Sequence, residues 1–133
     1  MLSSVFSVPR VAIGNSELRL NLIKKLCDIG YEVPTFIHGK AYVSPSAKIG
    51  IGCFIEPMAV VHTAVDVGTG CIFSAGVILN HNSVVHAGCH INCGSVVMAR
   101  AEIKAGTRTG YNEVCDTETV EHMKQHEKLP VAV

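Results

Sequence analysis

The sequence predicts an all-β fold, a left-handed parallel β-helix, and two periodic features of its middle part carry this prediction. From Ala41 onward the chain divides into hexapeptides without an insertion, and a large apolar residue recurs at the third position of each, from Val43 to Ile103. A small or β-branched residue follows four positions later, from Ala47 to Thr107. A period of six fits neither an α-helix nor a plain strand, but it fits short strands and turns wound into a three-sided coil.

Three hexapeptides make one coil, and three cysteines repeat at that interval. Cys53, Cys71 and Cys89 are 18 residues apart, so we expect them to stack inside successive coils at a spacing of about 4.8 Å. Disulfide geometry tolerates this separation. A reduced cysteine that fills a small core position is the preferred interpretation.

The chain of 133 residues has the size of one ordinary domain. We divide it into a partial N-terminal βαβ segment over residues 1–40, the β-helix over residues 41–112 and a C-terminal helix or tail over residues 113–133. The solenoid has open ends and a thin core, so we expect it to associate, and a homotrimer would bury one face of each subunit.

The βαβ segment is predicted from a strand pattern, a helix and a second strand. Val11–Gly14 has the pattern of a short buried strand, Asn15 or Ser16 is suited to cap a helix, and Gly30 is suited to end it. A second strand is expected around residues 33–37. The helix is expected to bury one apolar face: Leu18, Leu22, Leu26 and Ile29.

The hexapeptide rhythm breaks near the other end of the chain. Thr109 stands where an aliphatic residue was due, and we do not expect the repeat to resume. Asp116 or Thr117 is suited to cap a polar helix that runs to about Lys128. The preferred interpretation is a capping or solvated tail.

Composition excludes several partners. Lysine plus arginine and aspartate plus glutamate both number 11, so the charge balance does not favour nucleic acid or an anionic membrane. Apolar residues never run for the roughly 18 positions that a membrane span needs, and the first residues do not resemble a signal peptide. A cytoplasmic protein with reduced cysteines is expected.

The histidines of the coils are the best candidates for catalytic residues. His81 lies between the amides Asn80 and Asn82, and its neighbours one coil away, Thr63 and Ala99, are small. An imidazole held between amides at a subunit seam is suited to accept a proton from a hydroxyl or amine. We therefore identify His81 as the candidate general base.

The other coil histidines are weaker candidates. His90 lies half a coil beyond His81 on another edge, and in a trimer two such edges would meet across a seam. His62 and His86 are interpreted as surface residues. Three imidazoles hold zinc in γ-class carbonic anhydrases, but the spacing of their ligands is not reproduced here, so a zinc enzyme is a minor alternative and no metal ligand is assigned.

Two segments resemble the bacterial hexapeptide-repeat acyltransferases that include the sialic-acid O-acetyltransferases and UDP-amino-sugar N-acetyltransferases. Ile37–Gly50 is similar to the junction between that family's N-terminal domain and first coil, and Gly76–Asn82 is similar to its catalytic turn. The family uses acetyl-CoA to acetylate an amino or hydroxyl group of a sugar or nucleotide sugar.

The resemblance implies roles for particular residues. His81 corresponds to the general base, and Asn82 stands where the family commonly has an acidic residue. His90 corresponds to a second family histidine that contacts acyl-CoA or substrate at the seam, and Gly76 and Gly94 are assigned with it to the acyl-CoA site. The chain enters in the later half of the family's N-terminal domain and leaves the pattern after residue 106, so a trimeric scaffold or partner-binding module is the alternative, and a partner chain could supply the missing nucleotide-binding part.

Overall fold

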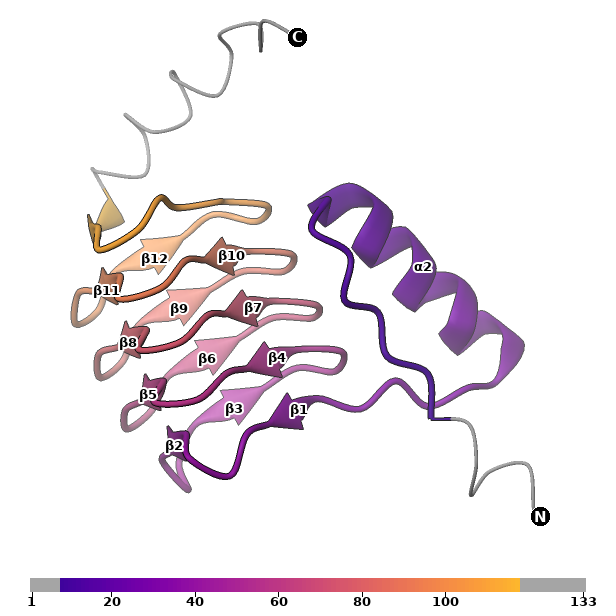
Figure 1. The fold of residues 1–133 in the computed structure, drawn as a ribbon, viewed down its shortest axis with the longest axis horizontal. Coiled ribbons are helices and arrows are strands. Elements are labelled where there is room, and N and C mark those ends of the chain that lie inside the picture. Colours follow the sequence, from indigo (N-terminus) through magenta and orange to yellow (C-terminus); the bar gives the residue numbers. More distant parts are fainter. Residues whose placement is uncertain (1–7, 118–133) are drawn as a thin grey trace, which may run out of the picture.

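The computed structural model describes residues 8–117, which form one α-helix, α2 (Ser16–Ile29), followed by thirteen two-residue strands (Figure 1). The strands form three parallel sheets. Sheet A contains β1 (Phe36–Ile37), β4 (Phe54–Ile55), β7 (Ile72–Phe73) and β10 (His90–Ile91). Sheet B contains β2 (Tyr42–Val43), β5 (Val60–Val61), β8 (Ile78–Leu79), β11 (Val96–Val97) and β13 (Val114–Cys115). Sheet C contains β3 (Lys48–Ile49), β6 (Asp66–Val67), β9 (Val84–Val85) and β12 (Glu102–Ile103).

Within each sheet, successive strands are 18 residues apart along the chain and pair with one another. Phe36 pairs with Phe54, and Tyr42 pairs with Val60, in parallel register. The chain therefore visits sheets A, B and C in turn and climbs one coil per round. The predicted three-sided parallel β-helix is confirmed. We name its edges the A–B, B–C and C–A corners after the two sheets that each turn connects.

The alternation of large and small residues fills the interior as predicted. The second residue of each strand points inward, and from Ile55 to Ile103 these side chains are at most 2% exposed. The small positions are buried as well, and the thiols of Cys53, Cys71 and Cys89 donate to backbone carbonyls of the next coil at 3.1 to 3.2 Å. These cysteines are unpaired core residues.

The repeat continues past the point where the sequence suggested that it stops, so that prediction was wrong. Thr109 is 3% exposed and occupies the core position, where its hydroxyl accepts a hydrogen bond from the amide of Asn92 at 2.8 Å. The backbone of Arg108 then forms an isolated parallel β-bridge with His90, and Cys115 in β13 lies in register with Val97 of β11. A hydrogen-bonded threonine thus replaces the expected aliphatic residue. The predicted polar helix from residue 116 to 128 lies almost wholly outside the described residues.

The N-terminal helix is confirmed, but the βαβ segment is not. Asn15 caps α2 by accepting a hydrogen bond from the Leu18 amide at 2.9 Å, and Gly30 ends it with a left-handed φ of 104°. Residues 11–14, however, form no strand. Phe36–Ile37 pairs with β4, so the second expected strand is the first strand of the β-helix.

The helix buries only part of the face that its leucines suggested, since Leu22 and Leu26 are partly buried against the cluster that contains Ile23. Arg19 and Ile23 are buried, whereas Leu18 and Ile29 are 48% and 72% exposed. The cause is the surface on which α2 lies (Figure 1), a column of glycine turns at the C–A corner. A Cβ atom at Gly70 would come within 2.8 Å of Leu20 and 3.0 Å of Ile23, so glycine lets the helix approach the coils closely.

Arg19 attaches the helix to two coils. Its guanidinium donates to the carbonyl of Gly70 at 2.7 Å and to that of Gly88 at 2.9 Å, and it also donates to the carbonyl of Ile13 at 2.7 Å. The side chain is 0% exposed. Because a buried arginine is stable only when its donors are satisfied, these carbonyls explain why a charged residue lies at this interface.

Replacing Arg19 should therefore destabilise the fold. We expect Arg19→Met to lower the free energy of unfolding by about 2–4 kcal/mol, because methionine fills the space but leaves buried carbonyls without donors. Urea unfolding followed by circular dichroism measures the change. Lys25→Met on the exposed face of α2 is the matched control and should stay within about 0.5 kcal/mol of the wild type; equal losses in both variants would contradict the assigned role.

Candidate functional site

The turn after β8 places His81 on the outside of the B–C corner. Its side chain is exposed, and the Asn82 side-chain oxygen lies 3.1 Å from its Nδ1 atom. The tautomer with hydrogen on Nδ1 donates to this oxygen and leaves the Nε2 lone pair available to accept a proton. The amide therefore orients the imidazole, although it supplies no negative charge.

The backbone around His81 is held by the neighbouring coils. Asn82 has a left-handed φ of 59°, its amide donates to the carbonyl of Thr63, and the carbonyl of His81 accepts from the amide of Arg100. Asparagine tolerates this conformation better than most residues. The small neighbours that the sequence indicated, Thr63 and Ala99, lie directly below and above the turn.

His90 lies on the outer surface of sheet A and is half-buried. Its Nε2 atom lies 3.2 Å from the hydroxyl of Ser74, and its Nδ1 atom is buried with no hydrogen-bond partner among residues 8–117. Burial lowers the pKa of His90 from its ordinary value of 6.5, and the nearby cations Arg108 and Arg19 lower it further. His90 is therefore neutral at neutral pH.

Gly76 and Gly94 occupy equivalent positions of successive turns at the A–B corner, with φ values of 73° and 71°. A Cβ atom at Gly76 would still be 3.9 Å from its nearest neighbour, Gly94. There is space beside Gly76, whereas the side chain of Asn112 in the next turn lies directly over Gly94. Ser74, which contacts His90, begins the same turn as Gly76.

One subunit does not bring all the candidate residues together. His81 and Asn82 lie at the B–C corner, whereas Gly76 and Gly94 lie at the A–B corner and His90 lies on the adjoining sheet A. The two corners bound opposite edges of sheet B. A site that used both groups would need a second copy of the chain.

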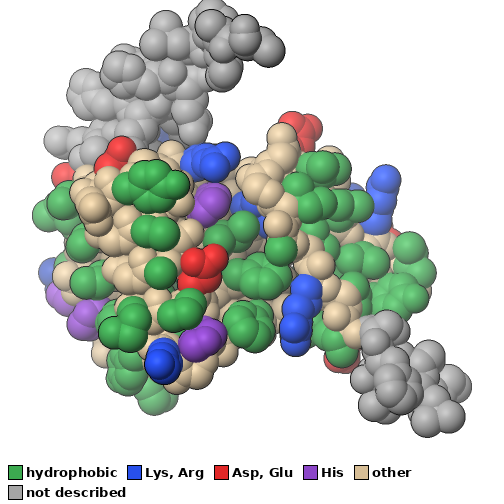
Figure 2. All heavy atoms as spheres, in the orientation of Figure 1, with side chains coloured by type: hydrophobic (Ala, Val, Ile, Leu, Met, Phe, Trp, Pro, Cys, Tyr) green, Lys and Arg blue, Asp and Glu red, His purple; other side chains and the backbone are tan. Residues whose placement is uncertain are grey.

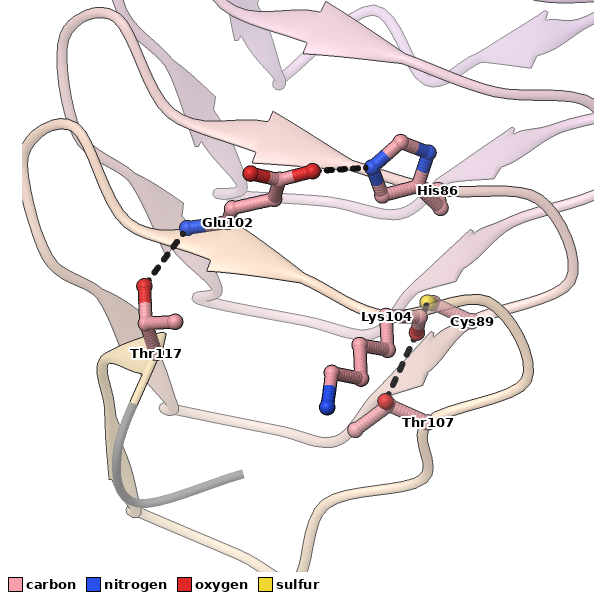
Figure 3. A network of polar contacts seen from close by, with 6 residues as sticks. All are labelled: His86, Cys89, Glu102, Lys104, Thr107 and Thr117. Carbon is pink, nitrogen blue, oxygen red and sulfur yellow. Dashed lines mark hydrogen bonds and ion pairs between the residues drawn. The ribbon is translucent and has the colours of Figure 1, made fainter. Parts of the chain in front are cut away.

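His86, which the sequence predicts as a surface residue, forms an ion pair with a carboxylate. The Nε2 atom of His86 lies 2.8 Å from a carboxylate oxygen of Glu102, and Figure 3 shows the two side chains pointing toward each other across sheet C. The side chains are 47% and 63% exposed, so this ion pair is solvated. The 18-residue repeat places Glu102 next to Val84 in β9, and His86 follows two residues later. This spacing could have identified the pair from the sequence.

Residues 8–117 contain no group of three or more histidine, cysteine or acidic side chains placed to hold a metal ion. Within the same range, no helix has the length and apolar character to cross a membrane.

The three parallel sheets with a six-residue repeat define a hexapeptide-type β-helix. Solved structures with a similar fold are acetyltransferases. The acetyltransferase domain of PglB from Neisseria gonorrhoeae matches with a TM-score of 0.54 and 23% identity, over 86% of this chain and 69% of that chain. The same domain in complex with acetyl coenzyme A matches with a TM-score of 0.50 and 28% identity, over 81% and 53%. This chain thus spans about half to two thirds of those chains, and its fold is that of hexapeptide-repeat acetyltransferases.

Comparison with protein-family models and with curated proteins gives no match.

The lowered pKa of His90 predicts an acid-dependent stability. The unfolded chain binds a proton at a higher pH than folded His90 does, so this residue stabilises the fold above the unfolded pKa, and the stability is lost as the pH falls toward the folded pKa. The melting temperature should therefore fall between about pH 7.5 and about pH 5.5. His90→Gln should show a smaller fall, whereas His62→Gln, at the exposed B–C corner, should keep the wild-type dependence. Identical pH profiles for His90→Gln and the wild type would refute this assignment.

Proposed function

We propose that the protein transfers the acetyl group of acetyl-CoA to an amino or hydroxyl group of a sugar or nucleotide sugar. The observation that carries the proposal is the match to the acetyltransferase domain of PglB solved with acetyl coenzyme A. The free space at Gly76, where an added Cβ would still lie 3.9 Å from its nearest neighbour, supports it, because an extended pantetheine arm needs room beside the backbone. His90 borders the same corner and completes the proposed donor contacts.

His81 is the proposed general base. Its Nε2 atom would take the proton from the acceptor while the acceptor oxygen or nitrogen attacks the thioester carbonyl. A tetrahedral oxyanion forms, and backbone amides of the adjoining turns would stabilise it. The intermediate collapses, the carbon–sulfur bond breaks, and the CoA thiolate leaves and takes up the proton from His81. Asn82 would keep Nε2 directed at the acceptor by holding Nδ1.

A homotrimer would complete the site, and the outer surface of sheet B supports this part of the proposal. Every outward residue of that sheet is apolar or aromatic: Tyr42, Val60, Ile78, Val96 and Val114. Tyr42 and Val114 are 57% and 60% exposed in the single chain. A continuous apolar column of this kind is characteristic of an association surface.

The geometry of a threefold assembly then joins the two groups of candidate residues. If sheet B faces a threefold axis parallel to the coils, each subunit directs its A–B corner toward the B–C corner of the next. His81 and Asn82 of one subunit would face Gly76, Gly94 and His90 of its neighbour. Three equivalent sites would follow, each made by two chains. The unpaired state of all six cysteines fits the proposed cytoplasmic location.

Removal of the proposed base should abolish transfer. We expect His81→Ala to lower the rate of acetyl transfer by at least about 100-fold, because general-base catalysis contributes on that order. Transfer of labelled acetyl from acetyl-CoA to a panel of amino sugars and nucleotide amino sugars measures the rate. His86→Ala, on sheet C, is the matched control and should remain active.

Equal turnover by the wild type and His81→Ala would refute the role of His81. The separate possibility of a non-catalytic trimeric scaffold is supported by the partner of His81, which among residues 8–117 is the neutral amide of Asn82 and not a carboxylate. Calorimetric titration with CoA distinguishes the two functions. Absence of both binding heat and stabilisation against unfolding at millimolar CoA would favour the scaffold.

The trimer has its own test. A charge in the middle of sheet B should prevent association because it would be buried without a partner. We therefore expect Ile78→Glu to give monomers in sedimentation equilibrium, whereas Val84→Glu should leave the trimer intact. Val84 is the matched control because it occupies the equivalent outward, half-buried position of sheet C. A monomeric wild type, or dissociation of both variants, would exclude sheet B as the interface.

A further inference from the structure

His81 has no negative charge beside it in its own chain. Among residues 8–117 its side chain pairs with the neutral amide of Asn82, whose oxygen lies 3.1 Å from Nδ1. The turns directly below and above, residues 62–65 and 98–101, contain no aspartate or glutamate. A histidine that takes a proton from an acceptor becomes an imidazolium, and a nearby carboxylate stabilises that cation. Such a carboxylate would have to come from another surface.

The A–B corner carries a carboxylate that reaches from one coil to the next. Glu56 follows β4, and its backbone is held in place, because its amide donates to the carbonyl of Phe73 at 3.0 Å and its carbonyl accepts from the amide of Ala59 at 3.2 Å. The Oε2 atom of Glu56 accepts a hydrogen bond from the amide of Ala75 in the following coil at 3.1 Å. This carboxylate therefore lies at the level of the turn that contains Ala75.

The carboxylate of Glu56 keeps capacity for a further partner. Glu56 is half-buried, and within residues 8–117 its side chain forms no ion pair. An ionised carboxylate can accept several hydrogen bonds, so one backbone amide leaves most of this capacity unused. Figure 2 shows an acidic side chain among hydrophobic ones in the middle of the β-helix face, and histidine side chains gathered at its left edge, where Figure 1 places the B–C turns.

Ala75 and His81 occupy equivalent positions of two consecutive turns. They are six residues apart, and each is the second residue after a strand, β7 or β8. One coil rises by about 4.8 Å, so a third of a coil separates the two positions by only about 2 Å along the solenoid axis. In the proposed trimer the A–B corner of one subunit faces the B–C corner of the next. The carboxylate of Glu56 then lies at the level of His81 of the neighbouring subunit.

We propose that Glu56 of one subunit supplies the negative charge for His81 of the neighbouring subunit. This inference rests on the proposed function and adds a positioning residue that acts through the general base. When Nε2 of His81 takes the proton from the acceptor, the ionised carboxylate of Glu56 stabilises the imidazolium across the seam. The carboxylate approaches from the coil before Gly76, whereas the proposed acyl-CoA contacts continue to Gly94 and His90 in the coil after it.

His62 is the alternative partner for this carboxylate. Glu56 and His62 each begin a turn of the preceding coil, so their backbones would lie at similar levels on the two sides of the seam. The hydrogen bond from the amide of Ala75 draws the carboxylate of Glu56 one coil further, toward His81. A variant of His62 therefore distinguishes the two partners.

Steady-state kinetics of acetyl transfer measure the contribution of Glu56. We expect Glu56→Gln to lower kcat about tenfold and to leave the KM for acetyl-CoA unchanged, because the charge acts on the transition state through His81. Glu56→Asp keeps the charge and should recover part of the loss. Glu102→Gln on sheet C is the matched control and should keep the wild-type kcat, and His62→Gln should keep it as well.

Mixed trimers test whether Glu56 acts between subunits. Glu56→Gln and His81→Ala chains with different affinity tags are expressed together, and trimers that carry both tags are purified. If the two residues belong to neighbouring subunits, each mixed trimer contains one site with both wild-type side chains. Turnover per intact His81 should then exceed that of the Glu56→Gln trimer by about five- to tenfold. Action within one chain would give no gain.

The outcomes separate this inference from the proposed function. No acetyl transfer by the wild type would exclude both together. An active wild type with an equally fast Glu56→Gln variant, or mixed trimers without a gain, would overturn the role of Glu56 alone. Glutamine keeps a carbonyl oxygen for the amide of Ala75, so Glu56→Gln should retain the fold and the trimer, which melting curves and sedimentation equilibrium verify.

Discussion

The narrow interior of the coil is the constraint on which the rest of this structure depends. Each hexapeptide contributes one large and one small inward side chain, and the parallel pairing repeats every 18 residues. An inserted residue would turn inward side chains outward and break the ladder, since alternate residues of a strand point to opposite faces. The uninterrupted register therefore fixes the position of every outward side chain, and chemically similar positions line up in columns along the solenoid.

One of these columns determines where the helix lies. The glycine turns of the C–A corner have no Cβ atoms, so α2 can approach until Arg19 reaches the carbonyls of Gly70 and Gly88. Within residues 8–117 this buried positive charge has no carboxylate partner and is stabilised by backbone carbonyl oxygens. The helix thus lies on the C–A corner, whereas His81 and Asn82 lie at the B–C corner and Gly76 and Gly94 lie at the A–B corner.

The outward side chains of the three sheets differ in their chemistry. An apolar sheet B between the A–B and B–C corners favours a threefold assembly in which each corner meets its counterpart from the next subunit. Sheet A adds an aromatic and cationic surface next to one of those corners. The proposed donor contacts and the proposed base thus lie on opposite edges of sheet B, and one subunit does not contain a complete site. This arrangement resembles other repeat proteins, in which function arises on surfaces that run across repeats.

The sequence by itself determined the solenoid, its core and the helix, because a sixfold alternation of side-chain size is a local property that only one kind of coil satisfies. It also located His81 between two amides. Other features depended on contacts between distant residues. The buried face of α2 was decided by glycines more than 50 positions away from Arg19, and Thr109 stayed in the core because Asn92 supplies a hydrogen-bond partner. The pairing of His86 with Glu102 likewise exists only once the coils are stacked, because stacking brings residues that are 16 positions apart in the sequence into contact.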